Sequence, residues 1–301
     1  MKAPSLLRQV GKRVLPEHLH PVMFGLRKKW LQSLERQKQL GEFATAILTE
    51  TKHGRLLVPA GDMEVGRYLA HGGNYGLAEI EFHLRYLTME SRILVVGTHV
   101  GALLVPLAKR VRRVVGIEAN PDTFRLLEMN VSLNGLSNVQ LYNIAAGNRN
   151  GEVDFLMHRC NTGASAIVSG DLAEGKPWAR FDEPKIQRLP IRKLDEVIME
   201  PAFDLIIMDV EGAEFDAMQG MERILASSQR LQIEIIPSLV RARSQATAEE
   251  FIQLLAKNFA TAQLLGQEQE MAIQPTATIL GKILQGSEGH DLFLEKSPRR
   301  R

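Results

Sequence analysis

The residues best suited to chemistry in this sequence come directly after short apolar runs. The loop Gly97-Thr-His-Val-Gly101 follows one run, Glu118 follows the next, and Asp209-Val-Glu-Gly-Ala-Glu214 follows a later one. Runs of this length predict buried parallel strands, and open parallel sheets bind ligands beyond the carboxyl ends of their strands. The sequence therefore predicts one site at a sheet edge, built from a glycine turn, a carboxylate and an acidic cluster.

The spacing of these residues favours a ligand that contains a nucleoside. Glu118 lies 21 positions after Gly97, a separation at which a carboxylate can accept hydrogen bonds from both ribose hydroxyls. Asn143 and Ala145 follow a third apolar run, where an amide and small side chains can border an adenine. We therefore expect all four residues to contact a bound cofactor.

Two nucleoside cofactors are compatible with this arrangement. A nicotinamide dinucleotide needs its pyrophosphate cradled by a Gly-x-Gly-x-x-Gly turn, which Thr98, His99 and Ala102 interrupt here. S-adenosylmethionine carries no phosphate and tolerates fewer glycines. The sequence favours S-adenosylmethionine and leaves an NAD-dependent oxidoreductase as the weaker alternative.

The elements that must position these residues alternate between strands and helices. Strands are expected at residues 92–96, 114–118, 139–143, 203–209 and 230–236, and helices at 79–89, 102–110, 121–133, 214–225 and 248–258. Asn120 is a good N-cap for the helix that begins at Pro121. This alternation predicts an α/β, Rossmann-like fold with a mostly parallel central sheet and helices on both faces.

Other segments extend this core. Alternating residues around 153–158 and 186–191 predict an inserted β-hairpin, and 276–282 and 291–295 are expected to supply the last antiparallel strands. We predict a Rossmann-like domain over residues 51–301. Residues 1–50 are expected to form a basic, mainly helical extension, interrupted near Pro16 and Pro21 and helical over Val22 to Leu40.

Composition limits the class of protein. The chain has 301 residues, of which 45% are hydrophobic and 24% charged, an ordinary globular balance. A single cysteine, Cys160, excludes an intrachain disulfide and is expected to be inert. The sequence has neither the run of roughly 18 apolar residues that spans a membrane nor a signal-peptide cleavage pattern, so we expect a cytoplasmic protein.

Charge is distributed unevenly. Residues 1–40 hold nine Lys or Arg and two Asp or Glu, a net +7, which leaves −5 for the rest of the chain. A cationic head favours contact with an acidic partner or a membrane surface, although packing on the main domain is the simpler interpretation. The basic residues avoid the motifs above, so we expect no nucleic-acid partner. No pattern in the sequence predicts an oligomeric state.

The motifs resemble the FkbM family of methyltransferases over about half the chain. The matching segments are Gly97-Thr-His-Val-Gly101, Ile117-Glu-Ala-Asn-Pro121, Asn130-Val-Ser-Leu-Asn-Gly135, Ala145-Ala-Gly147, Gly163-Ala-Ser165, Leu194-Asp195 and, most specifically, Met208-Asp-Val-Glu-Gly-Ala-Glu214. The resemblance implies a class I methyltransferase fold, S-adenosylmethionine as donor, and O-methylation of secondary metabolites or of sugars. It also implies donor contacts from Gly97, His99, Gly101 and Asn120, a ribose contact from Glu118, and Asp209, Glu211 and Glu214 near the transfer site.

Two positions depart from the family. Its members usually carry an acidic residue two places before the first glycine, where this chain has Val95, and Asn where it has His99. A methyltransferase-fold relative that binds a partner without catalysis is therefore the second alternative.

Methylation of a hydroxyl requires a base within hydrogen-bond reach of the acceptor. We favour Asp209 over Glu211, Glu214, His99 and His158 because it directly ends a predicted buried strand. Two neighbouring carboxylates without further ligands do not predict a metal. The loop Gly163-Ala-Ser-Ala166 is expected to cover a small-molecule or glycan acceptor, and Asn74 and Tyr75 to contact the methionine part of the donor.

Overall fold

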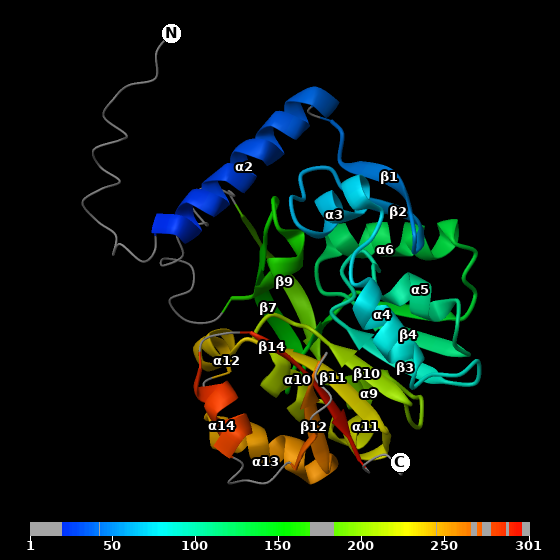
Figure 1. The fold of residues 1–301 in the computed structure, drawn as a ribbon, viewed down its shortest axis with the longest axis vertical. Helices are drawn as coiled ribbons and strands as arrows, with labels where there is room; N and C mark the ends of the chain where they lie inside the picture. The colour runs from blue at the N-terminus through cyan, green and yellow to red at the C-terminus, as the bar shows by residue number, and fades with distance from the viewer. Residues whose placement is uncertain are drawn as a thin grey trace.

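A computed structural model describes residues 20–41, 43–168, 184–244, 246–265, 270–272, 278–286 and 289–296. Within these residues an eight-stranded sheet has the order β13-β12-β14-β11-β10-β3-β4-β5 (Figure 1). Its strands are β3 (Arg92–Val96), β4 (Arg113–Ile117), β5 (Val139–Tyr142), β10 (Leu205–Met208), β11 (Arg230–Ile235), β12 (Thr261–Leu264), β13 (Glu270–Ala272) and β14 (His290–Glu295). The five strands from β11 to β5 are parallel, whereas β14 pairs antiparallel with both β11 and β12.

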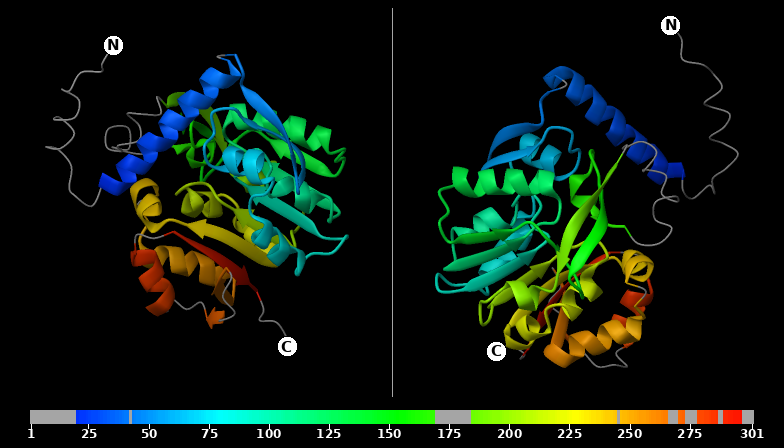
Figure 2. Two further views of the ribbon diagram at one scale, coloured as in Figure 1. Left: turned by 45° about the horizontal axis from the view of Figure 1, so that its top comes forward. Right: turned by 180° about the vertical axis from the view of Figure 1, so that it is seen from behind.

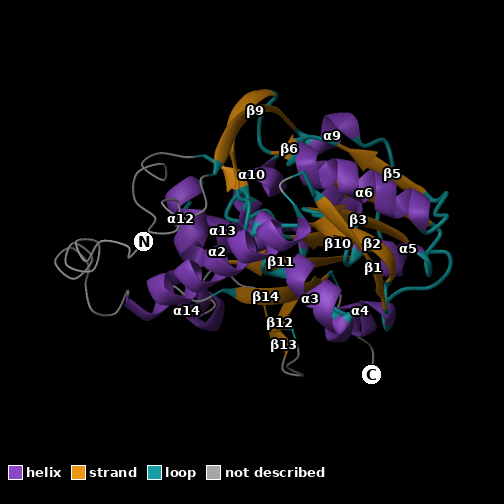
Figure 3. Cartoon of the chain, turned by 90° about the horizontal axis from the view of Figure 1, so that it is seen from above, coloured by secondary structure: helices purple, strands orange, loops and turns teal. Residues whose placement is uncertain are grey.

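Helices cover both faces of this sheet (Figures 2 and 3). One face carries α4 (Leu77–Leu84), α5 (Leu104–Ala108) and α6 (Pro121–Leu133), and the other carries α9 (Leu194–Val197), α10 (Glu214–Gln219), α11 (Glu222–Ser227), α12 (Pro237–Arg243), α13 (Ala248–Asn258) and α14 (Thr278–Gln285). Strand β3 illustrates how both faces are covered. Ile93 and Val95 belong to the apolar cluster under α4, α5 and α6, whereas Leu94 and Val96 belong to the cluster under the helices of the other face. Side chains alternate along a strand, so an unbroken apolar run supplies both faces.

Smaller elements surround the sheet. A hairpin of β1 (Ala46–Thr51) and β2 (Gly54–Pro59) packs on α6 with α3 (Val65–Gly72) nearby, and α2 (His20–Leu40) lies beside them at the edge of the molecule (Figure 1). A second sheet has the order β6-β9-β7-β8 and contains β6 (Ala145–Ala146), β7 (Gly151–Met157), β8 (Ala166–Ile167) and β9 (Lys185–Arg192). Strands β7 and β9 are antiparallel.

The predicted fold class is therefore confirmed: the protein is α/β, with a mostly parallel sheet, helices on both faces and an inserted hairpin. Asn120 caps α6 as predicted, since its side chain accepts a hydrogen bond from the Asp122 amide. The predicted boundary after residue 50 falls one residue before the end of β1, and the division into an extension and a domain stays a prediction.

Several local predictions were wrong. Residues 278–285 form helix α14 rather than a strand, because the apolar pairs Ile279-Leu280 and Ile283-Leu284 recur at a helical spacing of four. The helix expected over 214–225 is split into α10 and α11 at Gly220, where an added Cβ would lie 1.9 Å from the carbonyl oxygen of Gly147. Helix α5 is shorter than the predicted 102–110.

The structure also contains elements that the sequence patterns did not predict. They include the β1–β2 hairpin and α3, the helix α12 that begins at Pro237, and the strands β12 and β13. Helix α2 begins at His20, so Pro21 lies in its first turn, where proline is tolerated. Pro16 lies outside the described residues. Within the described part of the chain, every helix is too short or too polar to cross a bilayer.

Candidate active site

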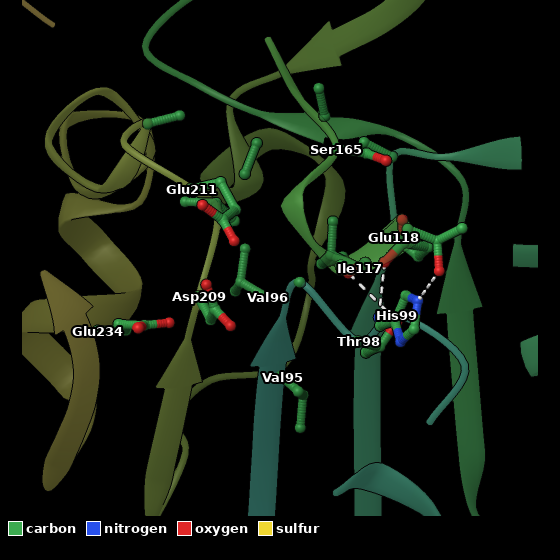
Figure 4. Close-up of a pocket in the computed structure, with 18 of the residues that line it drawn as sticks. Val95, Val96, Thr98, His99, Ile117, Glu118, Ser165, Asp209, Glu211 and Glu234 are labelled. Carbon is green, nitrogen blue, oxygen red and sulfur yellow. Dashed lines mark hydrogen bonds between the residues drawn. The ribbon is translucent and has the colours of Figure 1, made fainter. Parts of the chain in front are cut away.

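A cavity of about 340 Å³ lies beyond the carboxyl ends of β3, β4 and β10 (Figure 4). Strand β3 is flanked by β4 on one side and by β10 on the other, so the chain connections diverge at this point. That divergence leaves a crevice in which doubly wound sheets bind their ligands. The strand order thus accounts for the position of the cavity.

The glycine loop forms the base of the cavity. Gly97 has a φ of +89°, and a Cβ added there would lie 1.7 Å from the carbonyl oxygen of Asp209. Gly101 has a φ of +88° and lies over Leu127, 2.8 Å from where its Cβ would be. The loop therefore needs glycine twice, once for close contact with the β10 strand end and once for packing on α6.

Glu118 extends from the end of β4 into the same space. Its carboxylate accepts hydrogen bonds from the backbone amides of His99 and Asn120, at 2.7 and 2.8 Å, and from the Thr123 hydroxyl at 3.0 Å. Burial raises the pKa of Glu118, and His99 and the hydrogen bonds oppose that shift. Each carboxylate oxygen has two acceptor sites, so the group can hold the loop and still accept from a ligand.

His99 is fixed by residues that are distant in the sequence. Its backbone is left-handed, with a φ of +50°, and its Nε2 lies 2.6 Å from the Thr162 hydroxyl. That hydroxyl also donates to the carboxylate of Asp62, which is completely buried. Asp62 accepts further hydrogen bonds from the amides of Glu64 and Gly66. A single buried carboxylate thus joins α3, the glycine loop and the inserted sheet.

Helix α2 contacts this cluster from the outside. Ser33 donates a hydrogen bond to the carbonyl of Gly61 at 2.7 Å, and Arg36 donates to that of Asp62 at 3.3 Å. The helix therefore packs on the main domain, which was the simpler of the two interpretations of its sequence.

The opposite end of the cavity is acidic. Asp209, at the end of β10, and Glu234, near the end of β11, both line it, together with Glu211 (Figure 4). Asp209 is exposed where it opens onto the cavity, and the protein atoms around it replace part of its hydration. This desolvation, reinforced by the negative charges of Glu234, Glu211 and Glu214, raises the pKa of Asp209 well above its ordinary value.

The segment after Asp209 turns sharply. Glu211 and Gly212 have φ values of +54° and +98°, and the Glu214 carboxylate accepts hydrogen bonds from the amides of Val210 and Gly212. Glu214 is 1% exposed, and its burial raises its pKa to about 7. Glu214 therefore stabilises the turn that presents Asp209 and Glu211 to the cavity.

The structure brings seven of the twelve predicted site residues to the cavity: Tyr75, Gly97, His99, Glu118, Ala145, Asp209 and Glu211. Tyr75 has a pKa raised to about 12 by burial and by nearby carboxylates, so it is a neutral hydrogen-bond donor.

The remaining five are absent from the lining of this cavity. Gly101 turns the loop, Asn120 caps α6, Asn143 donates to the carbonyls of Glu118 and Ala119, Asn74 donates to the carbonyl of Gly72, and Glu214 supports the turn after β10. Their contacts with a cofactor stay predictions.

Sequence reasoning missed Glu234, Thr162 and Asp62. The sequence does contain a signal for Glu234, because a carboxylate within the mostly apolar strand 230–236 is unusual and indicates a specific role. Asp62 and Thr162 are 100 residues apart, so no local sequence pattern predicts their contact. In the described residues there is no group of three or more His, Cys, Asp or Glu side chains arranged to hold a metal ion.

The fold is that of class I methyltransferases, with the cavity at the sheet edge where such folds bind their ligands. Residues 96–260 match the Methyltransferase FkbM domain family, and the chain belongs to this family. Its members use S-adenosylmethionine as methyl donor.

Individual relatives match over shorter stretches. The chain is 30% identical over 126 residues to 2-O-methyltransferase NoeI of Sinorhizobium fredii (strain NBRC 101917 / NGR234), which covers 38% of this chain and 50% of that protein. It is 28% identical over 102 residues to a tRNA/tmRNA (uracil-C(5))-methyltransferase of Marinomonas sp. (strain MWYL1), which covers 33% of this chain and 27% of that one. The chain thus spans half or less of the curated relatives it matches.

Among solved structures, the chain is similar to an FkbM methyltransferase from Methylobacillus flagellatus KT. The TM-score is 0.42 at 16% sequence identity, and the match covers 69% of this chain and 44% of that one.

The cavity fits the donor of this family. The backbone of Gly97 lines the cavity, Glu118 offers acceptors for ribose hydroxyls, and Ile144, Ala145 and Phe155 supply an apolar wall for a purine. The described lining includes neither Lys nor Arg, which suits a sulfonium cation. The same acidic lining would repel the pyrophosphate of a nicotinamide dinucleotide, so the oxidoreductase alternative loses its support.

Proposed function

We propose that this protein is an S-adenosylmethionine-dependent O-methyltransferase that acts on a hydroxyl of a saccharide or a secondary metabolite. The observation that carries the proposal is the position of Asp209, which opens onto the cavity beside the glycine loop. The pKa of its carboxyl group is raised. A base within hydrogen-bond reach of the acceptor is the group that assists transfer to an alcohol.

The donor would be held by the chain in three parts. Glu118 would accept from the ribose hydroxyls, Ala145 and its neighbours would contact the adenine, and Gly97, His99 and Tyr75 would surround the methionine part. Thr162, which lines the cavity, and Asp62, which is buried behind it, would position His99. When bound, the donor supplies an electrophilic methyl group on a sulfonium sulfur.

The acceptor oxygen would lie between Asp209 and that methyl group. Asp209 would take the hydroxyl proton as the new carbon–oxygen bond forms, and holding the reacting atoms about 3 Å apart supplies much of the acceleration. Glu211, which faces the same end of the cavity, would orient the acceptor by accepting a hydrogen bond from a second hydroxyl. Glu214 would act through the turn that it stabilises.

The choice of a hydroxyl acceptor has two supports. One is the name of the relative from Sinorhizobium fredii, a 2-O-methyltransferase. The other is the acidic, hydrogen-bonding lining of the cavity, because carboxylates accept from hydroxyl groups and disfavour phosphates. A small neutral polyol matches this lining better than a nucleic acid does.

The cytoplasmic location and a membrane or protein contact through residues 1–40 stay predictions. Leu31 and Leu40 of α2 are 48% and 44% exposed, so this helix still offers apolar surface for such a contact.

The first test is a calorimetric titration of the purified protein with S-adenosylmethionine, S-adenosylhomocysteine and NAD. We expect micromolar binding of the two sulfur nucleosides and none of NAD. The variant Glu118→Ala should bind at least 100-fold more weakly, because two hydrogen bonds to a charged acceptor contribute about 1.5–3 kcal/mol each. Glu128→Ala, which removes an exposed carboxylate from α6, is the matched control.

The second test is transfer of a labelled methyl group to a panel of neutral saccharides and phenolic or polyketide-like alcohols. Methyl ethers formed by the wild type and lost in Asp209→Asn, with donor affinity retained, are the expected result. A protein that binds neither S-adenosylmethionine nor S-adenosylhomocysteine would contradict the proposal. Donor binding without transfer to any acceptor would instead favour the second alternative, in which Val95 and His99 mark a protein with a methyltransferase fold that binds a partner without catalysis.

A further inference from the structure

We propose that a second cavity binds a sugar with one negatively charged group, and that this site is linked to the donor cavity through residues shared by their walls. The second cavity has a volume of about 490 Å³ and lies where α2, α6 and the inserted sheet meet (Figure 1). Pockets that hold small ligands commonly measure about 300–1,000 Å³. Binding there requires no methyl transfer, so this inference goes beyond the proposed function.

The charge of the second cavity is opposite to that of the donor cavity. Its described lining includes three cations, Arg125 of α6, Arg159 after β7 and Lys185 at the start of β9. The lining contains one carboxylate, that of Asp122, which pairs with Arg125 at 3.0 Å. With histidine counted as neutral, the lining keeps an excess of two positive charges. Like charges gathered in one place raise the electrostatic energy of the protein, and an anion bound among them lowers it.

The inner surface of this cavity is built from buried polar side chains. Asn120, Thr123 and His158 line it, with exposed fractions of 2%, 1% and 5%. The three cations are exposed instead, so they stand at the mouth of the cavity and can reach a ligand from there. A polar inner surface below a positively charged rim suits a polar ligand that carries a negative charge.

Part of the cavity wall is apolar. Trp30 and Leu34 contribute to it from α2, and Leu126 and Met129 contribute from α6. A sugar ring has apolar C–H faces and a polar edge of hydroxyl groups, so it can pack on an indole while its hydroxyls reach hydrogen-bonding partners. An anion without a ring would leave this apolar surface uncovered. The lining therefore indicates a sugar phosphate or a sugar acid, which share a ring and one anionic group.

Residues that line the second cavity also hold the donor site in place. Thr123 donates a hydrogen bond to the Glu118 carboxylate at 3.0 Å. Thr162 lines both cavities, and its hydroxyl lies 2.6 Å from Nε2 of His99. A ligand that contacts either threonine thus touches a group that fixes Glu118 or His99. Such coupling is reciprocal, so each ligand changes the affinity of the other by the same factor.

The donor cavity offers no equivalent site for an anionic sugar. Its described lining contains five carboxylates and neither Lys nor Arg; the carboxylates are those of Glu64, Glu118, Asp209, Glu211 and Glu234. These charges repel an anion and accept hydrogen bonds from a neutral saccharide. Binding that depends on the negative charge of the sugar therefore distinguishes the second cavity from the acceptor site.

The first test uses Cys160 as a reporter. It is the single cysteine of the chain, is partly exposed, and lines the second cavity but not the donor cavity. Alkylation of Cys160 by a neutral maleimide in the full-length protein should slow as glucose 6-phosphate or glucuronate fills the cavity. Whichever of the two protects at lower concentration identifies phosphate or carboxylate as the anionic group. Protection by neither sugar, or equal protection by glucose or by inorganic phosphate alone, would overturn the proposal.

The positively charged rim is tested by substitution. Lys185→Gln should weaken the protecting sugar by about threefold, the effect of one exposed charge pair, and added salt should weaken it further. Lys52→Gln, which changes an exposed lysine in the β1–β2 turn, is the matched control and should bind as the wild type does. Equal affinities of Lys185→Gln and Lys52→Gln, with no effect of salt, would overturn recognition of the anion by this rim.

The link between the cavities is tested by titrating S-adenosylhomocysteine with and without the protecting sugar. We expect the Kd of the nucleoside to change by about fivefold or more. The concentration of sugar that protects Cys160 should change by the same factor when the nucleoside is bound. Protection of Cys160 with no change in either affinity would overturn the link and leave the second binding site standing.

Discussion

Replacing Glu214 by Gln should change how the stability of the protein depends on pH. Glu214 is buried behind the turn after β10, where its Oε1 accepts two backbone hydrogen bonds and its Oε2 has no partner among the described residues. Gln keeps a carbonyl oxygen for the two amides and carries no charge. The substitution therefore tests the ionisation of the side chain with little change in shape.

The magnitude follows from the pKa of Glu214, about 7 in the folded protein against an ordinary 4.5. Below pH 4.5 the group is protonated in the folded and unfolded states, and its full contribution to stability is present. Between the two pKa values only the folded state keeps the proton, so the free energy of unfolding falls as pH rises and the contribution is lost above pH 7. The difference of about 2.5 between the pKa values corresponds to about 3 kcal/mol.

The assay is reversible urea unfolding at a series of pH values from 4.5 to 8. Relative to the wild type, Glu214→Gln should gain about 3 kcal/mol across this interval, whereas Glu81→Gln, which changes an exposed carboxylate of α4, should follow the wild type closely. Asp291 contributes to the pH dependence of both proteins and cancels in the comparison. Asp209 loses one of the negative neighbours that raise its pKa, so its contribution changes in the same direction as that of Glu214. Superimposable pH dependences of wild type and Glu214→Gln would mean that Glu214 titrates normally, and the argument from its burial would be refuted.

Two other substitutions test the packing around the cavity. Gly97→Ala would drive a Cβ into the carbonyl of Asp209, so we expect donor affinity to fall at least tenfold by calorimetry; Gly135→Ala, which also has a positive φ but open space around it, should cost only about 1 kcal/mol of stability and leave affinity intact. Asn130→Ala removes a fully buried amide that makes three hydrogen bonds to the backbone of β2 and the glycine loop, so the free energy of unfolding should fall by roughly 2–4 kcal/mol in urea. Equal donor affinities of Gly97→Ala and Gly135→Ala, or an Asn130→Ala protein as stable as the wild type, would contradict these readings of the contacts.

The parts of the fold that sequence predicted well are those specified locally. The apolar runs that became β3, β4 and β10 are buried on both faces, so neither face needs polar residues and the run is unbroken. Asn120 and Pro121 carry a complete helix start in two adjacent residues. The order of strand and helix then limits the topology, and the loop after each strand falls at the same sheet edge.

The parts that sequence did not predict depend on contacts between distant segments. The place of Asp209 beside Glu234 follows from the register of β10 and β11, and the contact between Asp62 and Thr162 joins α3 to the inserted sheet. Gly220 breaks a helix because the backbone at Gly147 approaches it, which no window around Gly220 reveals. The side chains beside each strand end were therefore predictable, whereas the side chains that support them were not.

The place of β14 in the sheet has a consequence for the order of folding. This strand is the last of the described ones in sequence, yet it lies between β11 and β12 and pairs with both (Figure 1). Until residues 290–295 have been synthesised and inserted, the hydrogen-bonding edge of β11 stays open and Glu234 lacks its cross-strand neighbour. An open edge of this kind is a template for pairing with another chain. On the ribosome, β11, which carries Glu234, thus presents an open edge until synthesis reaches β14.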